Sequence, residues 1–220
     1  MGDYSMHKLK SKTRILFASM VAIAAVINPI SAASKQDPLA NSSEYMEAFA
    51  RIDAKDYKGA IIILEQLRKK TDNSPSLYYA LGKAQQELGE NKNALANYDK
   101  AISLDKTSSK AFSNRGLIQG ALGNLKAALA DFTKAIEINP RYDHAYSNRG
   151  VTRGALGDLK GAIADFTKAI SINPRFSAAW RNRGITREIA GNLKGACEDW
   201  RKAATLGQTD AAGWANGQCK

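Results

Sequence analysis

The sequence predicts an all-α protein, a solenoid of about five helical hairpins followed by a C-terminal capping helix. Residues recur at a fixed spacing of 34 positions without an insertion, and a period of this length is typical of stacked helical hairpins. The chain has 220 residues, five prolines and a hydrophobic content of 44%. Its many alanine, leucine, lysine and glutamate residues favour helices, and its length allows a sizeable core.

The repeat occupies residues 41–210. Its last three blocks are nearly copies of one another: the triplet Asn-Arg-Gly recurs in register and begins at Asn114, Asn148 and Asn182. An uninterrupted alignment at one spacing predicts a single repeat domain over 41–220, with residues 211–220 as a terminal cap that covers the last hairpin. The five blocks are 41–74, 75–108, 109–142, 143–176 and 177–210.

Each block carries the residues that two packed helices need. Small residues stand at the eighth and twentieth places of the block, and aromatic residues stand at the fourth and twenty-fourth places. Each aromatic residue is four positions from a small residue, a helical spacing that predicts a core between the helices. A glycine at the fifteenth place suits a left-handed helix end, and the next residue can cap the second helix. Examples in the third block are Gly116, Ala128, Phe132, Gly123 and Asn124, and Pro140 ends the second helix.

These residues make the chain similar to the tetratricopeptide repeat family, in its exported bacterial form, over 41–210. The resemblance implies a right-handed α-solenoid that is not an enzyme and binds proteins or peptides. Arginine stands at the seventh place of the last three blocks, where the family usually has leucine. The first block has Ala48, Lys55 and Asp72 instead of the glycines and proline. It is expected to be a degenerate cap that packs Tyr45, Phe49 and Ile52 inward if its turn is one residue shorter. The alternative is that these three residues form an apolar wall of a binding groove.

The resemblance also implies a concave groove lined by the first helix of each hairpin. Asn114, Asn148 and Asn182 hold the sixth place, and an amide both donates and accepts hydrogen bonds, so such a column can bind the backbone of an extended peptide. The alternative is solvent-exposed polar residues or hydrogen bonds within the scaffold. The expected groove is completed by Ser113, Ser147, Arg181, Leu117, Val151 and Ile185.

The arginines at the seventh place need partners if they are partly buried, because an unpaired buried charge is costly. Aspartates recur at the twenty-third place of the same blocks. We therefore expect a ladder of ion pairs between the helices of each hairpin, joining Arg115, Arg149 and Arg183 to Asp131, Asp165 and Asp199.

Cys197 and Cys219 are the two cysteines of the chain. In an oxidising compartment such a pair usually forms a disulfide, and here it would hold the capping helix to the last hairpin. The alternative is two unrelated core thiols.

The N-terminal segment has the layout of a secretory signal peptide over 1–33, followed by a linker over 34–40. Basic residues precede an apolar run from Ile15 to Ile27, and small residues follow it. We expect cleavage before Ser34 and a periplasmic or equivalent location. An uncleaved membrane anchor is the alternative.

The net charge of +11 admits acidic or anionic partners. Lysine rows at the eighteenth and twenty-sixth places lie on second helices, and the alternative function is a membrane-tethered structural component that docks on lipid or an acidic complex through them. No nucleic acid partner is expected for an exported protein. After the expected signal peptide, His144 is the single histidine, so the sequence predicts no catalytic site, no metal and no cofactor.

Overall fold

A computed structural model describes residues 37–39 and 41–219, and from Pro38 on these residues form one compact unit. They contain eleven α-helices and no strand. The expected signal peptide lies outside the described residues, as do residues 34–36 and 40 of the expected linker. The all-helical prediction is confirmed.

Ten of the helices pair as five hairpins, and an eleventh follows them. In each hairpin the first helix comes earlier in the chain, and we use "first helices" and "second helices" in that sense. The hairpins are α2 (Ser43–Asp53) with α3 (Tyr57–Lys70), α4 (Pro75–Glu87) with α5 (Asn91–Leu104), α6 (Ser109–Ala121) with α7 (Leu125–Ile138), α8 (Asp143–Ala155) with α9 (Leu159–Ile172), and α10 (Ser177–Ile189) with α11 (Leu193–Thr205); α12 (Thr209–Gln218) is the last helix.

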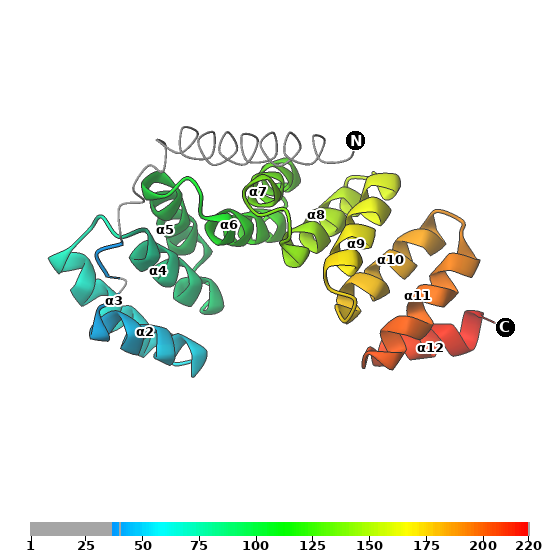
Figure 1. Ribbon diagram of the computed structural model, residues 1–220, viewed down its shortest axis with the longest axis horizontal. Coiled ribbons are helices and arrows are strands. Elements are labelled where there is room, and N and C mark those ends of the chain that lie inside the picture. The colour runs from blue at the N-terminus through cyan, green and yellow to red at the C-terminus, as the bar shows by residue number, and fades with distance from the viewer. Residues whose placement is uncertain (1–36, 40, 220) are drawn as a thin grey trace, which may run out of the picture. The chain divides into compact units, whose positions relative to one another are not determined.

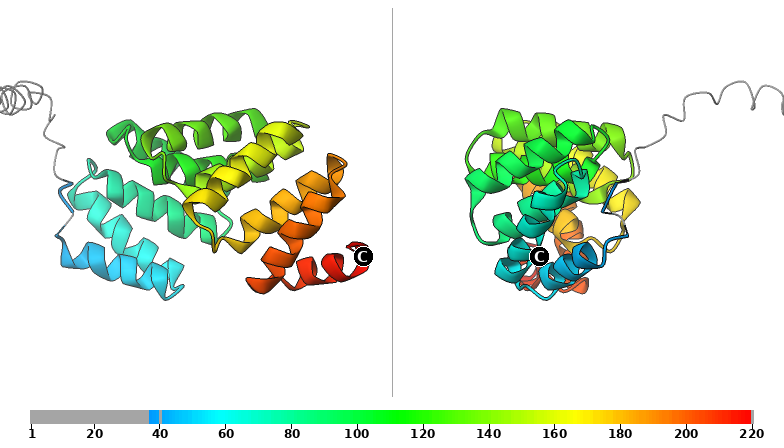
Figure 2. Two further views of the ribbon diagram at one scale, coloured as in Figure 1. Left: turned by 45° about the vertical axis from the view of Figure 1, so that its right-hand side comes forward. Right: turned by 90° about the vertical axis from the view of Figure 1, so that its left-hand side faces the viewer.

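The hairpins stack in chain order (Figures 1 and 2). Each second helix packs against the first helix of the next hairpin. Successive first helices also touch, from α2 through α10, whereas contacts between successive second helices are sparser within the described unit. The first helices therefore form a continuous layer, and we call its solvent-facing side the first-helix face.

The turns inside the hairpins depend on a left-handed residue. Gly89, Gly123, Gly157 and Gly191 adopt φ of 76° to 83°, a conformation that costs glycine little. In the first hairpin Lys55 adopts the same conformation, with φ of 62°. The expectation of a shorter first turn is wrong, because the Asp56 amide still donates to the Arg51 carbonyl as the Glu90 amide does to Gln85.

The core lies between the paired helices and is built on close contact between glycine and an aromatic ring. A Cβ added to Gly150 would lie 2.9 Å from the Phe166 ring, and one added to Gly184 would lie 2.5 Å from Trp200. The rings of Tyr98, Phe132, Phe166 and Trp200 are at most 2% exposed. They are core residues, as the helical spacing predicts.

The capping helix α12 covers the end of the last hairpin. Its Ala211 and Ala215 are buried, and the Trp214 ring lies 5.5 Å from the Trp200 ring, measured between centroids. A disulfide joins Cys197 of α11 to Cys219, directly after α12. These contacts attach the cap covalently and by apolar packing.

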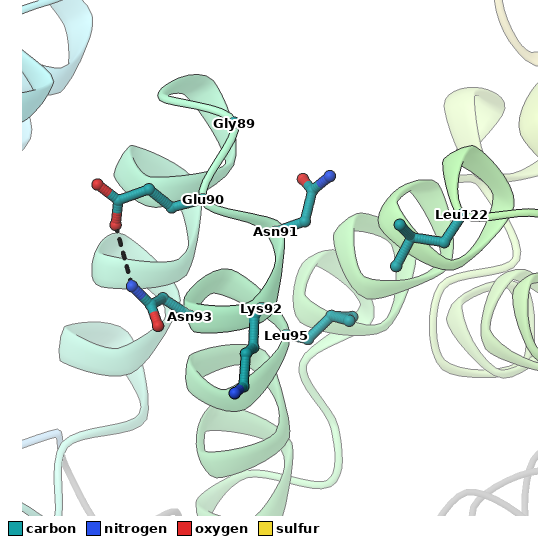
Figure 3. A pocket seen from close by; sticks show the side chains of 7 residues that line it. All are labelled: Gly89, Glu90, Asn91, Lys92, Asn93, Leu95 and Leu122. Atoms are coloured by element: carbon teal, nitrogen blue, oxygen red, sulfur yellow. Dashed lines mark hydrogen bonds between the residues drawn. The ribbon is translucent and has the colours of Figure 1, made fainter.

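An open hollow of about 610 Å³ lies at the turn between α4 and α5, beside the next hairpin (Figure 3). Residues 89–93 form one side of it, and Leu95 and Leu122 supply its apolar part. Asn93 donates a hydrogen bond to Glu90 across its rim. None of the groove residues expected from the sequence lines this hollow.

Candidate functional site

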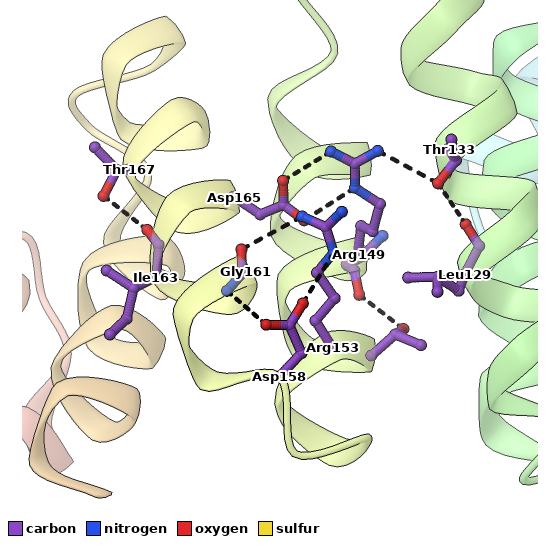
Figure 4. A network of polar contacts seen from close by, with 11 residues as sticks. Leu129, Thr133, Arg149, Arg153, Asp158, Gly161, Ile163, Asp165 and Thr167 are labelled. Carbon is purple, nitrogen blue, oxygen red and sulfur yellow. Dashed lines mark hydrogen bonds and ion pairs between the residues drawn. The ribbon is translucent and has the colours of Figure 1, made fainter. Parts of the chain in front are cut away.

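The first helices are held in place by the buried ion pairs that the sequence predicts. Arg149 of α8 donates from Nε and Nη2 to the two carboxylate oxygens of Asp165 in α9, at 2.9 and 2.8 Å (Figure 4). The same two-pronged pair joins Arg115 to Asp131 and Arg183 to Asp199. The Arg–Asp ladder is confirmed, and it links the helices of each of the last three hairpins.

The ladder also reaches the neighbouring hairpin. The third nitrogen of Arg149 donates to the Thr133 hydroxyl of the preceding second helix, and Arg183 does the same with Thr167. Arg115 instead pairs with the carboxylate of Asp99 at 2.7 Å. The hydrogen bond from Arg115 to Asp131 raises the pKa of this guanidinium further above its ordinary value. Each arginine thus sets the register within its hairpin and between hairpins.

A second arginine completes the pair in the last two hairpins. Arg153 Nη1 donates to Asp165 at 2.8 Å, and Arg187 Nη1 donates to Asp199 at 3.0 Å. Each of these buried carboxylates therefore has two cationic partners, which compensates for its removal from water. Spacing alone did not reveal this second arginine, which lies four residues after the first.

The first asparagine of the expected column, Asn114, is engaged inside the scaffold. Its amide nitrogen donates to the hydroxyls of Tyr98 at 3.2 Å and Tyr79 at 3.4 Å. Burial raises the pKa of Tyr79 to about 12 and that of Tyr98 further still. The alternative interpretation, hydrogen bonding within the scaffold, applies to this amide nitrogen.

The other two asparagines differ from Asn114. Asn148 is half-buried, and its side chain has no hydrogen-bond partner among the described residues. Asn182 is also half-buried and accepts a hydrogen bond from the neighbouring Arg181 at 3.1 Å. Asn148 therefore presents the least committed amide of the column.

Apolar side chains lie one helical turn beyond the asparagines, on the same face of each first helix. Leu117 is 39% exposed and Val151 is 50% exposed. Ile185 is half-buried. Exposed aliphatic side chains beside amides make a surface of mixed polarity, which we call the amide–aliphatic column: Asn114, Leu117, Asn148, Val151, Asn182 and Ile185.

Two expected groove residues do not reach the surface. Ser113 is 1% exposed and Ser147 is 3% exposed, which corrects the expectation that they line the groove. Ser113 directly follows Ala111 and Phe112, and all three residues are buried in α6. The side chain of a serine is too short to pass the neighbours that close over it.

Arg181 is a groove residue by position but is bound by the cap. Its Nε donates to Asp210 at 2.6 Å, and its guanidinium lies 5.1 Å from the centre of the Trp214 ring. The hydrogen bond from Arg181 lowers the pKa of Asp210. The residue thus fastens α12 to α10 in this structure.

The lysine rows lie on the opposite, second-helix side and are exposed. Helix α9 exposes Lys160 and Lys168, while Asp165, its only carboxylate, is buried in the ladder. Within the described residues no helix is long and apolar enough to span a membrane, and no group of three His, Cys, Asp or Glu residues is placed to hold a metal ion.

Comparison with known proteins agrees with this architecture. A tetratricopeptide repeat family model matches residues 109–142 and 144–176, and a second TPR repeat model matches 87–123. No curated protein sequence matches the chain significantly.

Solved structures of the same fold are numerous. A crystal structure of MamA is 27% identical, covers 75% of this chain and 96% of its own, and has a TM-score of 0.66. YrrB, described as a TPR protein with an unusual peptide-binding site, is 21% identical, covers 79% of this chain and 90% of its own, and has a TM-score of 0.65. PilF of Pseudomonas aeruginosa is 16% identical, covers 76% of each chain, and has a TM-score of 0.71.

The tetratricopeptide repeat model coincides with the hairpins from α6 to α9, the second model spans α5 and α6, and the neighbours share the stacked helical architecture. The sequence period, the described helices and the comparisons therefore agree, and the chain is a tetratricopeptide repeat protein.

Proposed function

We propose that this protein is a non-enzymatic scaffold that binds an extended segment of a partner polypeptide on its first-helix face, across α6, α8 and α10. The observation that carries this proposal is Asn148, a half-buried amide without an internal partner, one turn from the half-exposed Val151. An amide without an internal hydrogen-bond partner, beside apolar surface, is suited to receive both the backbone and the side chains of a peptide.

The chemistry of the amide–aliphatic column fits an extended chain. Asn148 can donate to a backbone carbonyl and accept from a backbone amide, which is independent of the peptide sequence. Leu117, Val151 and Ile185 can contact apolar side chains of the same peptide, which adds preference for such residues. We infer weak sequence selectivity with a preference for apolar side chains.

The Arg–Asp ladder supports this function by holding the column rigid. Arg149 follows Asn148 directly and makes three hydrogen bonds to two side chains, Asp165 of α9 and Thr133 of α7. The backbone at Asn148 is therefore held before a ligand arrives, and preorganisation reduces the entropy lost on binding. Arg183 plays the same part beside Asn182.

We propose an exported, extracytoplasmic location, because the Cys197–Cys219 disulfide is chemically suited to an oxidising compartment. The comparison with YrrB adds only that this fold carries a peptide-binding site in another protein. Assistance in the assembly of a complex is the biological role that we infer for such a scaffold.

The test is selection from a displayed library of random unstructured peptides with the wild-type chain and the double variant Asn148→Ala/Asn182→Ala. We expect the selected peptides to be rich in apolar residues and to lose at least about tenfold in affinity for the variant, since two backbone hydrogen bonds contribute roughly 1 kcal/mol each. Val151→Asp is expected to weaken them similarly.

The matched control is Lys160→Glu/Lys168→Glu on the exposed face of α9, away from the column. We expect it to bind the same peptides within about twofold. If this control abolishes binding while the asparagine variant, shown to be folded by circular dichroism, does not, then the lysine rows are the working surface and the proposal is wrong.

A further inference from the structure

The Cys197–Cys219 disulfide is not sealed inside the cap. Both cysteines line an open hollow of about 370 Å³ between α11 and the end of α12. A hollow of this size lies within the range of small-molecule sites. Small reagents can therefore approach the disulfide from solvent.

The hollow carries more positive than negative charge. Lys194, Arg201 and Glu198 line it, and all three are exposed. Arg201 Nη2 also donates to the Cys219 carbonyl at 2.8 Å, which holds this cation at the edge of the hollow beside the disulfide. Two cations against one carboxylate attract an anionic reagent and repel a cationic one.

The two sulfur-bearing residues differ in access and in their neighbours. Cys197 is 6% exposed, whereas Cys219 is half-buried. Lys194 precedes Cys197 by three residues on α11, so the two side chains are neighbours on the helix surface. A nearby ammonium group stabilises a thiolate, so Cys197 is the better leaving group. The greater exposure of Cys219 makes its sulfur the more accessible point of attack.

We propose that this hollow is a thiol-exchange site for small anionic thiols, and that exchange at Cys219 releases α12 from the end of the solenoid. The thiolate of the reagent forms a bond to Cys219 Sγ, the Cys219–Cys197 bond breaks, and its electron pair leaves on Cys197. A second thiolate then attacks the reagent's sulfur, which leaves Cys219 as a thiolate and the reagent as its own disulfide. The reagent is oxidised and the protein disulfide is reduced.

Reduction is expected to release α12 because the disulfide is the covalent link that closes the loop between Cys197 and Cys219, which are 22 residues apart in the sequence. Once it opens, α12 is held by the Trp200–Trp214 packing and by Arg181, which binds Asp210. Loss of the closed loop increases opening of α12 on the order of a hundredfold on the chain-entropy estimate. Opening also frees Arg181. The exchange step itself does not rest on the proposed peptide binding.

The first experiment measures the rate of disulfide reduction by 2-mercaptoethanesulfonate, an anionic thiol, and by cysteamine, a cationic one. Rates are divided by the thiolate concentration of each reagent, at low ionic strength. We expect the anionic thiol to react at least about threefold faster, and Lys194→Glu/Arg201→Glu to reverse that order. Equal normalised rates for the wild type would overturn the proposal.

The control is Lys160→Glu/Lys168→Glu, which changes the net charge equally but lies on α9, outside the hollow. It is expected to keep the preference for the anionic thiol. If it removes the preference as fully as the hollow variant does, the effect belongs to the overall charge and the site is refuted. The mixed disulfide, trapped by alkylation and mapped by mass spectrometry, is expected on Cys219; a dominant adduct on Cys197 contradicts the assigned direction of attack.

The second experiment compares amide hydrogen exchange across α12 in the oxidised and reduced protein. Exchange in α12 is expected to rise on the order of a hundredfold on reduction, while α8 and α9 stay unchanged. Unchanged exchange in α12 would show that packing alone holds the cap, and the release step would be wrong.

Discussion

Arg149 of α8 binds both carboxylate oxygens of Asp165 in α9, at 2.9 and 2.8 Å, and Arg153 adds a third hydrogen bond to the same carboxylate at 2.8 Å. The Asp165 side chain is 5% exposed. A buried carboxylate with three charged hydrogen bonds links the two helices of this hairpin far more firmly than a surface ion pair does.

Replacing Asp165 with alanine is expected to destabilise the protein by about 3 to 5 kcal/mol, because two partly buried arginines lose their counter-charge. The measurement is urea unfolding followed by circular dichroism. Asp99→Ala is the matched control, since Asp99 also pairs with a ladder arginine but its side chain is 61% exposed. Its expected cost is below about 1 kcal/mol. Similar losses for both variants would mean that burial of the ladder contributes nothing.

Lys55→Gly is expected to stabilise the first hairpin by about 0.5 to 1 kcal/mol, because Lys55 has φ of 62°, a conformation in which a side chain is strained. The midpoint of thermal unfolding is the readout. Gly123→Ala makes the reverse change at the equivalent turn of the third hairpin, where φ is 82°. It should lower the midpoint, and a rise there would contradict the conformational argument.

Gly184→Ala is expected to destabilise the last hairpin by about 1 to 3 kcal/mol, as overpacking does. The new Cβ would lie 2.5 Å from two atoms of the Trp200 ring and 3.3 Å from the Ala196 carbonyl. In the control Gly154→Ala, the nearest atom is 3.9 Å away, so the helix-favouring alanine is expected to stabilise α8 by about 0.5 kcal/mol. Tolerance of alanine at Gly184 would show that Trp200 can move aside.

Alkaline pH is expected to destabilise the fold through Tyr79. Burial raises its pKa from 10.0 to about 12, so above pH 10 the unfolded state releases a proton that the folded state keeps. The part of the free energy of unfolding that depends on the Tyr79 proton is fully present below pH 10 and is lost as the pH rises toward 12. Urea midpoints at pH 9.5 and pH 11 measure the loss. Tyr79→Phe should reduce the difference between them, and an identical difference would exclude this tyrosine as its source.

The sequence by itself determined the hairpins, their register and the ladder. The 34-residue spacing puts glycine against an aromatic ring and arginine against aspartate in each of the last three copies, because both pairs lie within one repeat at fixed helical offsets. Such local pairings follow from helix geometry alone. The second arginine of the ladder, Arg153, lies on the same face of its helix as Arg149. The repeat pattern did not predict it, because Gln119 holds the equivalent place in the third block.

Only the tertiary structure decided which groove positions are available. Asn114 and Asn148 hold the same place in their blocks, yet Asn114 meets Tyr79, 35 positions earlier, and Asn148 meets no such partner among the described residues. Arg181 is bound by Asp210, 29 positions later. These partners come from neighbouring repeats and from the cap, so the exposure of a groove side chain depends on packing between hairpins, which the repeat pattern does not contain.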